Sequence, residues 1–306
     1  MNNLMTHREH IFNVKHRVKS RDLMYYDHTI INEKTINENT ISIVMAASNR
    51  SRQTYFTLLS MVKNKTRDIH IIIVDDSDVD PIETNILKTY PFFIDFIRIN
   101  RYNKDWHNPL VNYNIGFQFV KGSKVIIQNA EVCHVGCLLD LIGEGLDDNK
   151  YHVFDVKASL NFDTNEGIYL HGVADLSIYD KDLYYIWYQG RELNRKYHFL
   201  TAMTRQTFDR IEEFSYDCTM GCSFDDNDFV LKIESLGIEF VNMFHDVCQV
   251  GGVHLFHAIS TDTWDRHQEV NEDLFNNKKR VWAETQEYID ATKDEETFND
   301  MYRKLQ

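Results

Sequence analysis

Ile41-Ser42-Ile43-Val44-Met45-Ala46 is the stretch that decides the fold, because it is a nearly continuous apolar run of strand length. Similar runs recur at residues 71–74 (IIIV), 93–99 (FIDFIRI) and 125–127 (VII). Strands that are apolar on both sides are typical of a parallel sheet whose two faces are covered. The four runs therefore predict a parallel sheet buried in the middle of the molecule.

Helical patterns separate these predicted strands. Ser48-Asn49 can cap a first helix. One face of that helix would carry Tyr55, Leu58, Leu59 and Val62. Pro81 suits the first position of a short helix, and Asn108-Pro109 opens another helix that Gly122 would end. The alternation predicts an α/β fold with a mostly parallel, Rossmann-like sheet and helices on both faces.

The second half of the chain is less regular. Strand patterns occupy residues 151–156, 199–203, 238–243 and 253–256. Residues 164–187 read as aromatic-rich loops with room for a hairpin. Two helices are expected, one through Ile211 that Thr204 caps, and one over residues 226–236 that Gly237 ends.

The domain organisation is predicted from the absence of any Pro- or Gly-rich linker. We expect one catalytic unit over residues 41–260. Residues 1–40 are polar and form an N-terminal extension, partly helical or loosely packed. Residues 261–306 alternate charges with apolar anchors, which predicts a C-terminal helical tail. These extensions could mediate a homodimer.

The charge, hydropathy and cysteine content of the chain exclude several classes of protein. The formal net charge of −14 argues against a nucleic-acid partner. No segment approaches the roughly 18 apolar residues that cross a bilayer, and residues 1–8 lack the apolar core of a signal peptide. The five cysteines favour free thiols in a reducing compartment, and a zinc site near His134 is conceivable, although no familiar spacing is present. We expect a cytoplasmic protein.

Three polar clusters lie where a ligand would bind. Residues 223–229 (SFDDNDF) place three carboxylates before a helix, residues 75–78 (DDSD) end the second strand, and residues 129–131 (NAE) follow the fourth. A helix start by itself favours acids, so an isolated cluster would be structural. The carboxyl ends of strands are the ligand-binding edge of an open α/β sheet. Together the clusters predict a site for a metal and a phosphorylated ligand.

Glycine-rich phosphate loops do not follow the first strand. Ala46-Ala47-Ser48 stands where a nicotinamide enzyme has G-x-G-x-x-G, and no G-x-x-x-x-G-K-[ST] loop is present.

The motifs, taken in order, resemble inverting glycosyltransferases of the GT-A fold, especially the large family 2. The resemblance rests on residues 43–50 (IVMAASNR), 72–77 (IIVDDS), 114–122, 126–131 (IIQNAE) and 221–229, and it spans residues 41–257. It implies a nucleotide-sugar donor, most often linked to UDP, and a hydroxyl acceptor on a glycan or glycoprotein. It also implies a divalent cation, Mn²⁺ or Mg²⁺, which would stabilise the leaving diphosphate.

The resemblance assigns roles to individual residues. The donor site would comprise Ala47, Ser48, Asn49, Arg50, Asp75, Asp76, Asn114 and Asn129, with Asp75 or Asp76 on the nucleotide base. Glu131 would bind the metal. Asp226 would be the general base that deprotonates the acceptor, and Asp225 would bind the acceptor. The usual Asp-x-Asp metal motif is Asn129-Ala130-Glu131 here, so one carboxylate is lost and Asn129 would contact ribose.

Two further assignments complete the predicted site. Related transferases often carry a metal-binding histidine late in the chain. We favour His254 over His257, since two residues that are three positions apart in a regular strand point to opposite faces. A histidine satisfied within the sheet is the alternative. Trp187 and Tyr188, with Tyr184, Tyr185 and Tyr197 nearby, suit an acceptor lip, although aromatic clusters are more often core. Trp106 and Asn108-Pro109 would line the donor side.

The predicted function is metal-dependent, inverting transfer of a sugar, of the hexosyltransferase type. One rival is a non-catalytic sugar- or nucleotide-binding module, favoured by the altered metal motif and disfavoured by Asp225-Asp226. Another is a nucleotidyltransferase, which would need a Gly-rich basic loop after the first strand. The few prolines and many Asn, Lys and Ile residues fit an AT-rich genome, of a low-GC bacterium or a large DNA virus. A viral origin would imply the host cytoplasm.

Overall fold

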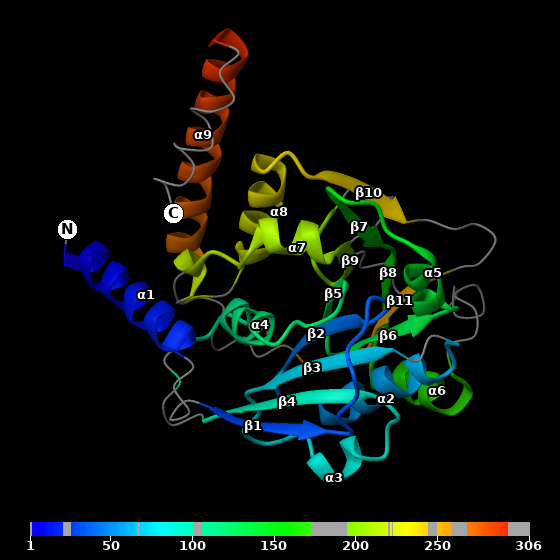
Figure 1. The fold of residues 1–306 in the computed structure, drawn as a ribbon. Coiled ribbons are helices and arrows are strands. Elements are labelled where there is room, and N and C mark those ends of the chain that lie inside the picture. The colour runs from blue at the N-terminus through cyan, green and yellow to red at the C-terminus, as the bar shows by residue number, and fades with distance from the viewer. Residues whose placement is uncertain are drawn as a thin grey trace.

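A computed structural model describes residues 2–20, 26–65, 68–100, 104, 106–172, 195–219, 221, 223–243, 250–258 and 268–292. An eight-stranded sheet runs through the body of the molecule in the order β1-β4-β3-β2-β5-β9-β7-β10 (Figure 1). Its strands are β1 (Tyr26–Ile31), β2 (Ile41–Ala47), β3 (Ile69–Asp75), β4 (Phe93–Ile99), β5 (Lys124–Asn129), β7 (Lys150–Phe154), β9 (Leu200–Thr204) and β10 (Glu239–Met243). A three-stranded sheet contains β6 (Val132–Val135), β11 (Gly251–His254) and β8 (Val156–Ala158) in that order.

The centre of the large sheet is parallel, as predicted. β2 pairs in parallel with β3 and β5, and β3 pairs in parallel with β4. Every residue of β2 and β3 is buried. β1 and β9 run antiparallel to their neighbours, and β10 is parallel to β7. The parallel centre brings the carboxyl ends of β2, β3 and β5 to one edge, which prepares a site there.

Helices cover both faces of the sheet. The helices are α1 (Asn2–Ser20), α2 (Ser51–Val62), α3 (Thr84–Leu87), α4 (Leu110–Phe117), α5 (Leu138–Glu144), α6 (Phe162–His171), α7 (Arg205–Ile211), α8 (Asp225–Ser235) and α9 (Gln268–Thr292), with the 3₁₀ helix η2 at Tyr216–Cys218. One apolar core lies between the sheet and α4, α7 and α8, and a second lies between the sheet and α2, α3 and α5. Both cores are built from the apolar strand runs, so the prediction of a doubly covered α/β sheet is confirmed.

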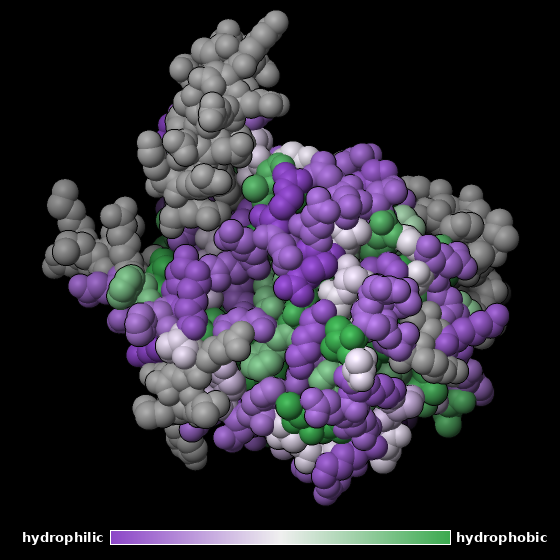
Figure 2. Space-filling view, in the orientation of Figure 1, coloured by the Kyte–Doolittle hydropathy of each residue, from purple (hydrophilic) through white to green (hydrophobic). Residues whose placement is uncertain are grey.

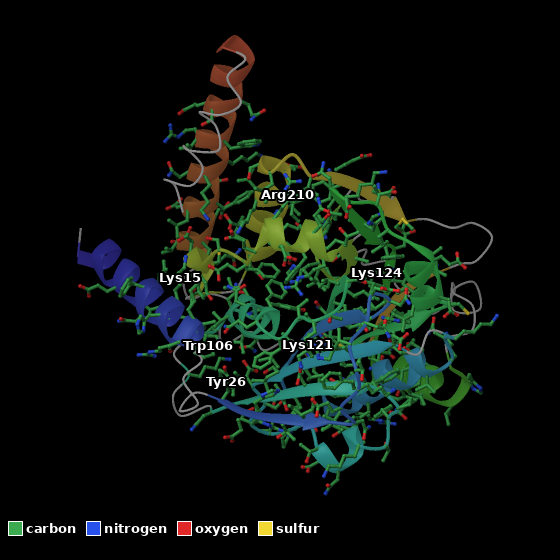
Figure 3. All side chains as sticks on the ribbon, viewed as in Figure 1. Lys15, Tyr26, Trp106, Lys121, Lys124 and Arg210 are labelled. Carbon is green, nitrogen blue, oxygen red and sulfur yellow. The ribbon has the colours of Figure 1, made fainter. Side chains whose placement is uncertain are left out.

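Close packing holds α4 against the sheet. A Cβ added to Gly116 would lie 2.7 Å from Val44 Cγ1 on β2, closer than real carbon contacts. Trp106, labelled in Figure 3, is buried just before this helix and donates its indole N–H to Asn112 Oδ1 at 3.1 Å. The loop before α4 is thereby held beside the carboxyl edge of the sheet.

The chain before Ile41 contributes to the sheet, whereas regular structure was predicted to start at Ile41. β1 pairs with β4, and His28 Nε2 lies 2.9 Å from Oδ1 of the buried Asp95. Asp95 also contacts His70 Nε2 at 2.8 Å and accepts a hydrogen bond from Lys121 Nζ at 2.7 Å. The middle of β1 is exposed, so it lacks the apolar run that identifies the central strands. The division of the chain at residues 40 and 260 stays a prediction.

Several predicted elements differ from the structure. Leu59 is 56% exposed, whereas Gln53, Thr54 and Thr57 of α2 are buried, because this helix turns a partly polar face to the sheet. The helix that Gly122 was expected to end already ends at Phe117. Residues 164–171, predicted as loop, belong to α6, whose Ile168 packs on the small sheet. Residues 151–156 form parts of two strands in different sheets, because the chain crosses from one sheet to the other at Asp155.

The long helix α9 projects from the body beside α8 (Figure 1). Lys278 of α9 pairs with Asp217 at 2.6 Å and with Asp228 of α8 at 2.7 Å. The visible surface is largely hydrophilic, with small scattered apolar groups (Figure 2). Within the described part of the chain, no helix is both long and apolar enough to cross a membrane.

Candidate active site

A cavity of about 520 Å³ lies at the carboxyl edge of the parallel strands. The end of β2 contributes Ala47, the loop after it contributes Ser48 and Arg50, and the turn after β3 contributes Asp76. The other polar residues that line it are Lys104, His107, Asn112, Tyr113, Asn129, Glu131, His198, Ser223, Asp225, Asp226, His254 and His257. The three polar clusters of the sequence therefore meet in one cavity.

A carboxylate and two imidazoles converge at one part of this cavity. Glu131 Oε1 lies 3.2 Å from His254 Nε2 and 3.4 Å from His257 Nε2. The three residues have the mutual spacing of a metal-ligand group. Glu131 Oε2 is buried and makes no hydrogen bond within the described residues. A buried carboxylate oxygen without a partner is costly, and a divalent cation is a partner that suits a Glu and two His.

The Glu131 carboxylate is held ionised by its neighbours. Burial alone would raise its pKa, but Arg50, whose Nη1 donates to Oε1 at 3.0 Å, and the two histidines hold the pKa well below its usual range. Burial lowers the pKa of His254, which favours the neutral imidazole that binds metals.

The placement of His257 corrects the prediction that it points away from His254. β11 ends at His254, so the next three residues do not alternate as in a strand. The two imidazole rings lie 5.2 Å apart between centroids, and both face Glu131. The alternation rule failed because it applies only while the backbone stays extended.

Asp76 forms a polar group on the side of the cavity near α4. Its Oδ2 accepts a hydrogen bond from Asn112 Nδ2 at 2.9 Å and pairs with Lys104 Nζ. Burial opposes ionisation of this carboxyl, but Lys104, Asn112 and Ser48 lower its pKa below the ordinary value. Asp76 is therefore an ionised hydrogen-bond acceptor at the edge of the cavity.

The first turn of α8 supplies a pair of carboxylates. Ser223 and Phe224 have φ values of 73° and 66°, a left-handed conformation that is strained for such residues. This turn starts α8 so that Asp225 and Asp226 both line the cavity. Asp226 Oδ1 lies 2.8 Å from Nδ1 of His198.

Asp225 and Asp226 raise the pKa values of groups beside them. Burial and the neighbouring Asp226 raise the pKa of Asp225 to about 6. Burial would lower the pKa of His198, but Asp226 and Asp225 raise it above its ordinary value. The two carboxylates thus favour the protonated form of His198, and the 2.8 Å contact orients the Asp226 carboxylate that could accept a proton.

Three predicted donor-site residues do not line the cavity. Asp75 is fully buried, where it accepts hydrogen bonds from the backbone of Ser77 and Ile82 and pairs with Arg98. Asn49 Oδ1 accepts hydrogen bonds from the backbone N–H groups of residues 78–80. Asn114 exchanges two hydrogen bonds with the backbone of residue 214. These hydrogen bonds and ion pairs hold together the loops and the helix that frame the cavity.

The aromatic residues that were predicted to line the site lie in different places. Trp187 and Tyr188, with Tyr184 and Tyr185, lie outside the described residues. Tyr197 lines a different cavity, and Pro109 lines this one while Trp106 is buried nearby.

Several lining residues were not anticipated, and Lys104, Asn112 and His198 are among them. His198 lies two residues before β9, and a polar residue close to a strand was the available signal. Lys104 had no comparable signal, because its partner Asp76 is 28 residues away in the chain.

Comparisons with known proteins agree with this geometry. The sequence model described as "Glycosyl transferase family 2" matches residues 42–212, more than half of the chain. No curated protein matches the chain by sequence.

Two solved structures share the fold. The structure of S. aureus TarS matches at a TM-score of 0.51 and 12% identity, covering 71% of this chain and 37% of that one. The structure of S. aureus TarS 1-349 in complex with UDP-GlcNAc matches at a TM-score of 0.52 and 13% identity, covering 77% and 64%. The chain spans less than two thirds of each of these proteins.

Proposed function

The chain belongs to glycosyl transferase family 2, and from this premise we propose that it transfers a hexosyl group from a UDP-sugar to a hydroxyl of a glycan or glycoprotein, with inversion and with a divalent cation. The single observation that carries the proposal is the meeting of three groups in one cavity. These are the ionised Asp76, the cluster Glu131–His254–His257, and the carboxylate pair of α8. A module that only binds sugars has no need of the last group.

The nucleotide would bind on the Asp76 side. An ionised, partly satisfied carboxylate suits the N–H of a uracil ring, because a charge-assisted hydrogen bond is stronger than a neutral one. Asn129, whose Oδ1 accepts from Tyr113 at 3.1 Å, would contact the ribose. The TarS complex with UDP-GlcNAc makes UDP-sugars the first donors to test.

Glu131, His254 and His257 would hold the cation, and the unpartnered Glu131 Oε2 fits this role. When bound, a divalent cation neutralises charge that develops on a leaving diphosphate. Arg50 lies beside Glu131 and contacts His257 Nδ1 at 3.3 Å. Its guanidinium can bind a diphosphate oxygen in the same region, because Arg suits phosphate recognition.

Asp226 would act as the general base. The acceptor oxygen forms a bond to the anomeric carbon while the bond from that carbon to the diphosphate oxygen breaks. The acceptor proton passes to the Asp226 carboxylate. His198 orients this carboxylate, and Asp225 would hydrogen-bond the acceptor.

The decisive experiment is thermal unfolding with UDP, in the presence of Mn²⁺ or of EDTA. A ligand at 100 times its dissociation constant stabilises the folded state by about 2.7 kcal/mol. We expect UDP to raise the melting temperature more with Mn²⁺ than with EDTA. Melting that is unchanged by millimolar UDP-sugars and Mn²⁺ would overturn the donor-site proposal. If Glu131→Ala binds UDP and Mn²⁺ as the wild type does, the ligand assignment alone is wrong.

A further inference from the structure

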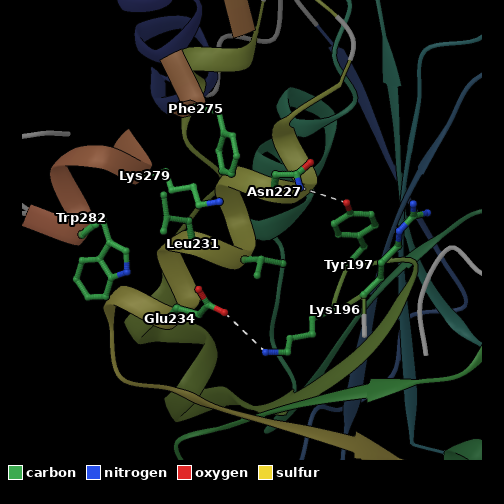
Figure 4. A pocket seen from close by; sticks show the side chains of 11 residues that line it. Lys196, Tyr197, Asn227, Leu231, Glu234, Phe275, Lys279 and Trp282 are labelled. Atoms are coloured by element: carbon green, nitrogen blue, oxygen red, sulfur yellow. Dashed lines mark hydrogen bonds and ion pairs between the residues drawn. The ribbon is translucent and has the colours of Figure 1, made fainter. Parts of the chain in front are cut away.

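A second cavity, of about 540 Å³, lies between α8 and α9 (Figure 4). It shares no lining residue with the candidate active site. α8 contributes Asn227 and Glu234, α9 contributes Phe275, Lys279 and Trp282, and the segment before β9 contributes residues 195–197. The proposed transfer reaction does not use this cavity.

The aromatic side chains of this cavity suit a sugar. Tyr197, from the segment before β9, and Phe275 and Trp282, both from α9, line a common space (Figure 4). Aromatic rings offer large apolar faces together with, in Tyr and Trp, a polar edge. The Tyr197 hydroxyl accepts a hydrogen bond from Asn227 Nδ2 at 3.2 Å, which orients the ring. Such a surface can stack on the C–H face of a pyranose and hydrogen-bond its hydroxyls.

The charged side chains of this cavity suit an anion. Arg195, Lys196 and Lys279 line it together with a single carboxylate, Glu234, which lies 3.7 Å from Lys196 Nζ. Lys279 is exposed and has no ion-pair partner in the described part of the chain. A cluster of three cations against one acid is unusual on a chain of net charge −14. It would attract an acidic ligand by its local field.

Consecutive residues connect the two cavities. His198 and Asp226 line the candidate active site, whereas their chain neighbours Tyr197 and Asn227 line the second cavity. Phe224, at the start of α8, also contacts Phe275 of α9, with 5.7 Å between ring centroids. A chain-like ligand that crosses the start of α8 can therefore reach both cavities.

We propose that the cavity between α8 and α9 is a subsite for an anionic glycan, the part of the acceptor that lies beyond the attacking hydroxyl. The acceptor class is then a carbohydrate that carries carboxylates or phosphates. The binding of an anionic glycan follows from this cavity alone, and its role as acceptor rests on the proposed function.

The test uses the full chain and isothermal titration calorimetry. The probes are a galacturonic acid hexamer, which is anionic, and maltohexaose, which is a neutral glucan of the same length. We expect the uronate hexamer to bind at least tenfold more tightly than maltohexaose. Trp282→Ala and Lys279→Gln should each weaken the uronate at least tenfold, and saturating UDP should leave its affinity unchanged.

A matched control removes the same charge elsewhere. Lys88 is an exposed lysine at the end of α3, far from α8 in Figure 1, so Lys88→Gln should bind the hexamer as the wild type does. If the uronate hexamer binds Trp282→Ala and Lys279→Gln as tightly as the wild type, or if UDP displaces it, then it binds outside this cavity and the proposal is overturned. No binding at millimolar hexamer would do the same.

The two proposals fail separately. If UDP with Mn²⁺ stabilises the chain but the hexamer does not bind, only the glycan subsite is wrong. If the hexamer binds and UDP does not, the donor site is wrong, since hexamer binding requires no metal. Lys279 is exposed, so Lys279→Gln should fold even if the Trp282 variant does not.

Discussion

Asp226→Asn should separate sugar transfer from donor binding. The change keeps the shape of the side chain and one oxygen acceptor, but it removes the basic carboxylate that lies 2.8 Å from His198. Loss of a general base typically costs about 10²–10⁴ in rate. At about 1.36 kcal/mol for each tenfold, this corresponds to a barrier higher by about 2.7–5.4 kcal/mol.

The structure also predicts what happens to His198. Its side chain is 6% exposed, and Asp226 raises its pKa against the effect of burial. Asp225 still raises the pKa of His198 in this variant, but without the Asp226 charge the effect of burial is opposed less, so the pKa of His198 should fall. The pH titration of His198, followed by NMR, should therefore shift to lower pH in Asp226→Asn.

The rate of sugar transfer is measured in the wild type and the variant by the release of UDP, and the glycosylated product is identified by its mass. Asp228→Asn is the matched control on the same helix, because Asp228 pairs with Lys278 at 2.7 Å and does not line the active-site cavity. That control should melt at a lower temperature but transfer sugar at the normal rate. Equal rates in Asp226→Asn and the wild type would remove Asp226 from the mechanism. No transfer by the wild type across a broad acceptor panel would favour the binding-module alternative.

Three other outcomes are expected. Asp76→Ala should weaken UDP binding by about 1–3 kcal/mol in calorimetry, and unchanged affinity would mean that Asp76 only holds its turn. His257→Ala should weaken the Mn²⁺-dependent part of UDP stabilisation, whereas an effect of His254→Ala alone would restore the single-histidine prediction. Burial would raise the pKa of Asp95, but hydrogen bonds from His70, Lys121 and His28 lower it below the ordinary value, so its contribution is complete above about pH 4 and is lost as the pH falls further. In acid unfolding curves, the stability gap between the wild type and Asp95→Asn should therefore shrink below about pH 4, and a constant gap would show that the carboxylate charge contributes nothing.

Much of the candidate site was accessible from the sequence, because its residues follow apolar strands or stand at the start of a helix. Asp76 and Glu131 were found in the first way and the pair at the start of α8 in the second, and all line the cavity. The sequence did not show which of two adjacent acidic residues would line the cavity. Asp75 and Asp76 are adjacent, yet one binds the backbone of residues 77 and 82 while the other faces the cavity.

The sequence by itself determined the class of the sheet and the edge at which the site lies. Apolar periodicity is a local property, and burial on both faces imposes it strand by strand. The tertiary structure decided which side chains meet. Glu131 reaches His254 and His257 across more than 120 residues of chain, and His257 joins the cluster because β11 ends at His254. Such contacts depend on where strands end and loops turn, and local patterns do not encode these distances.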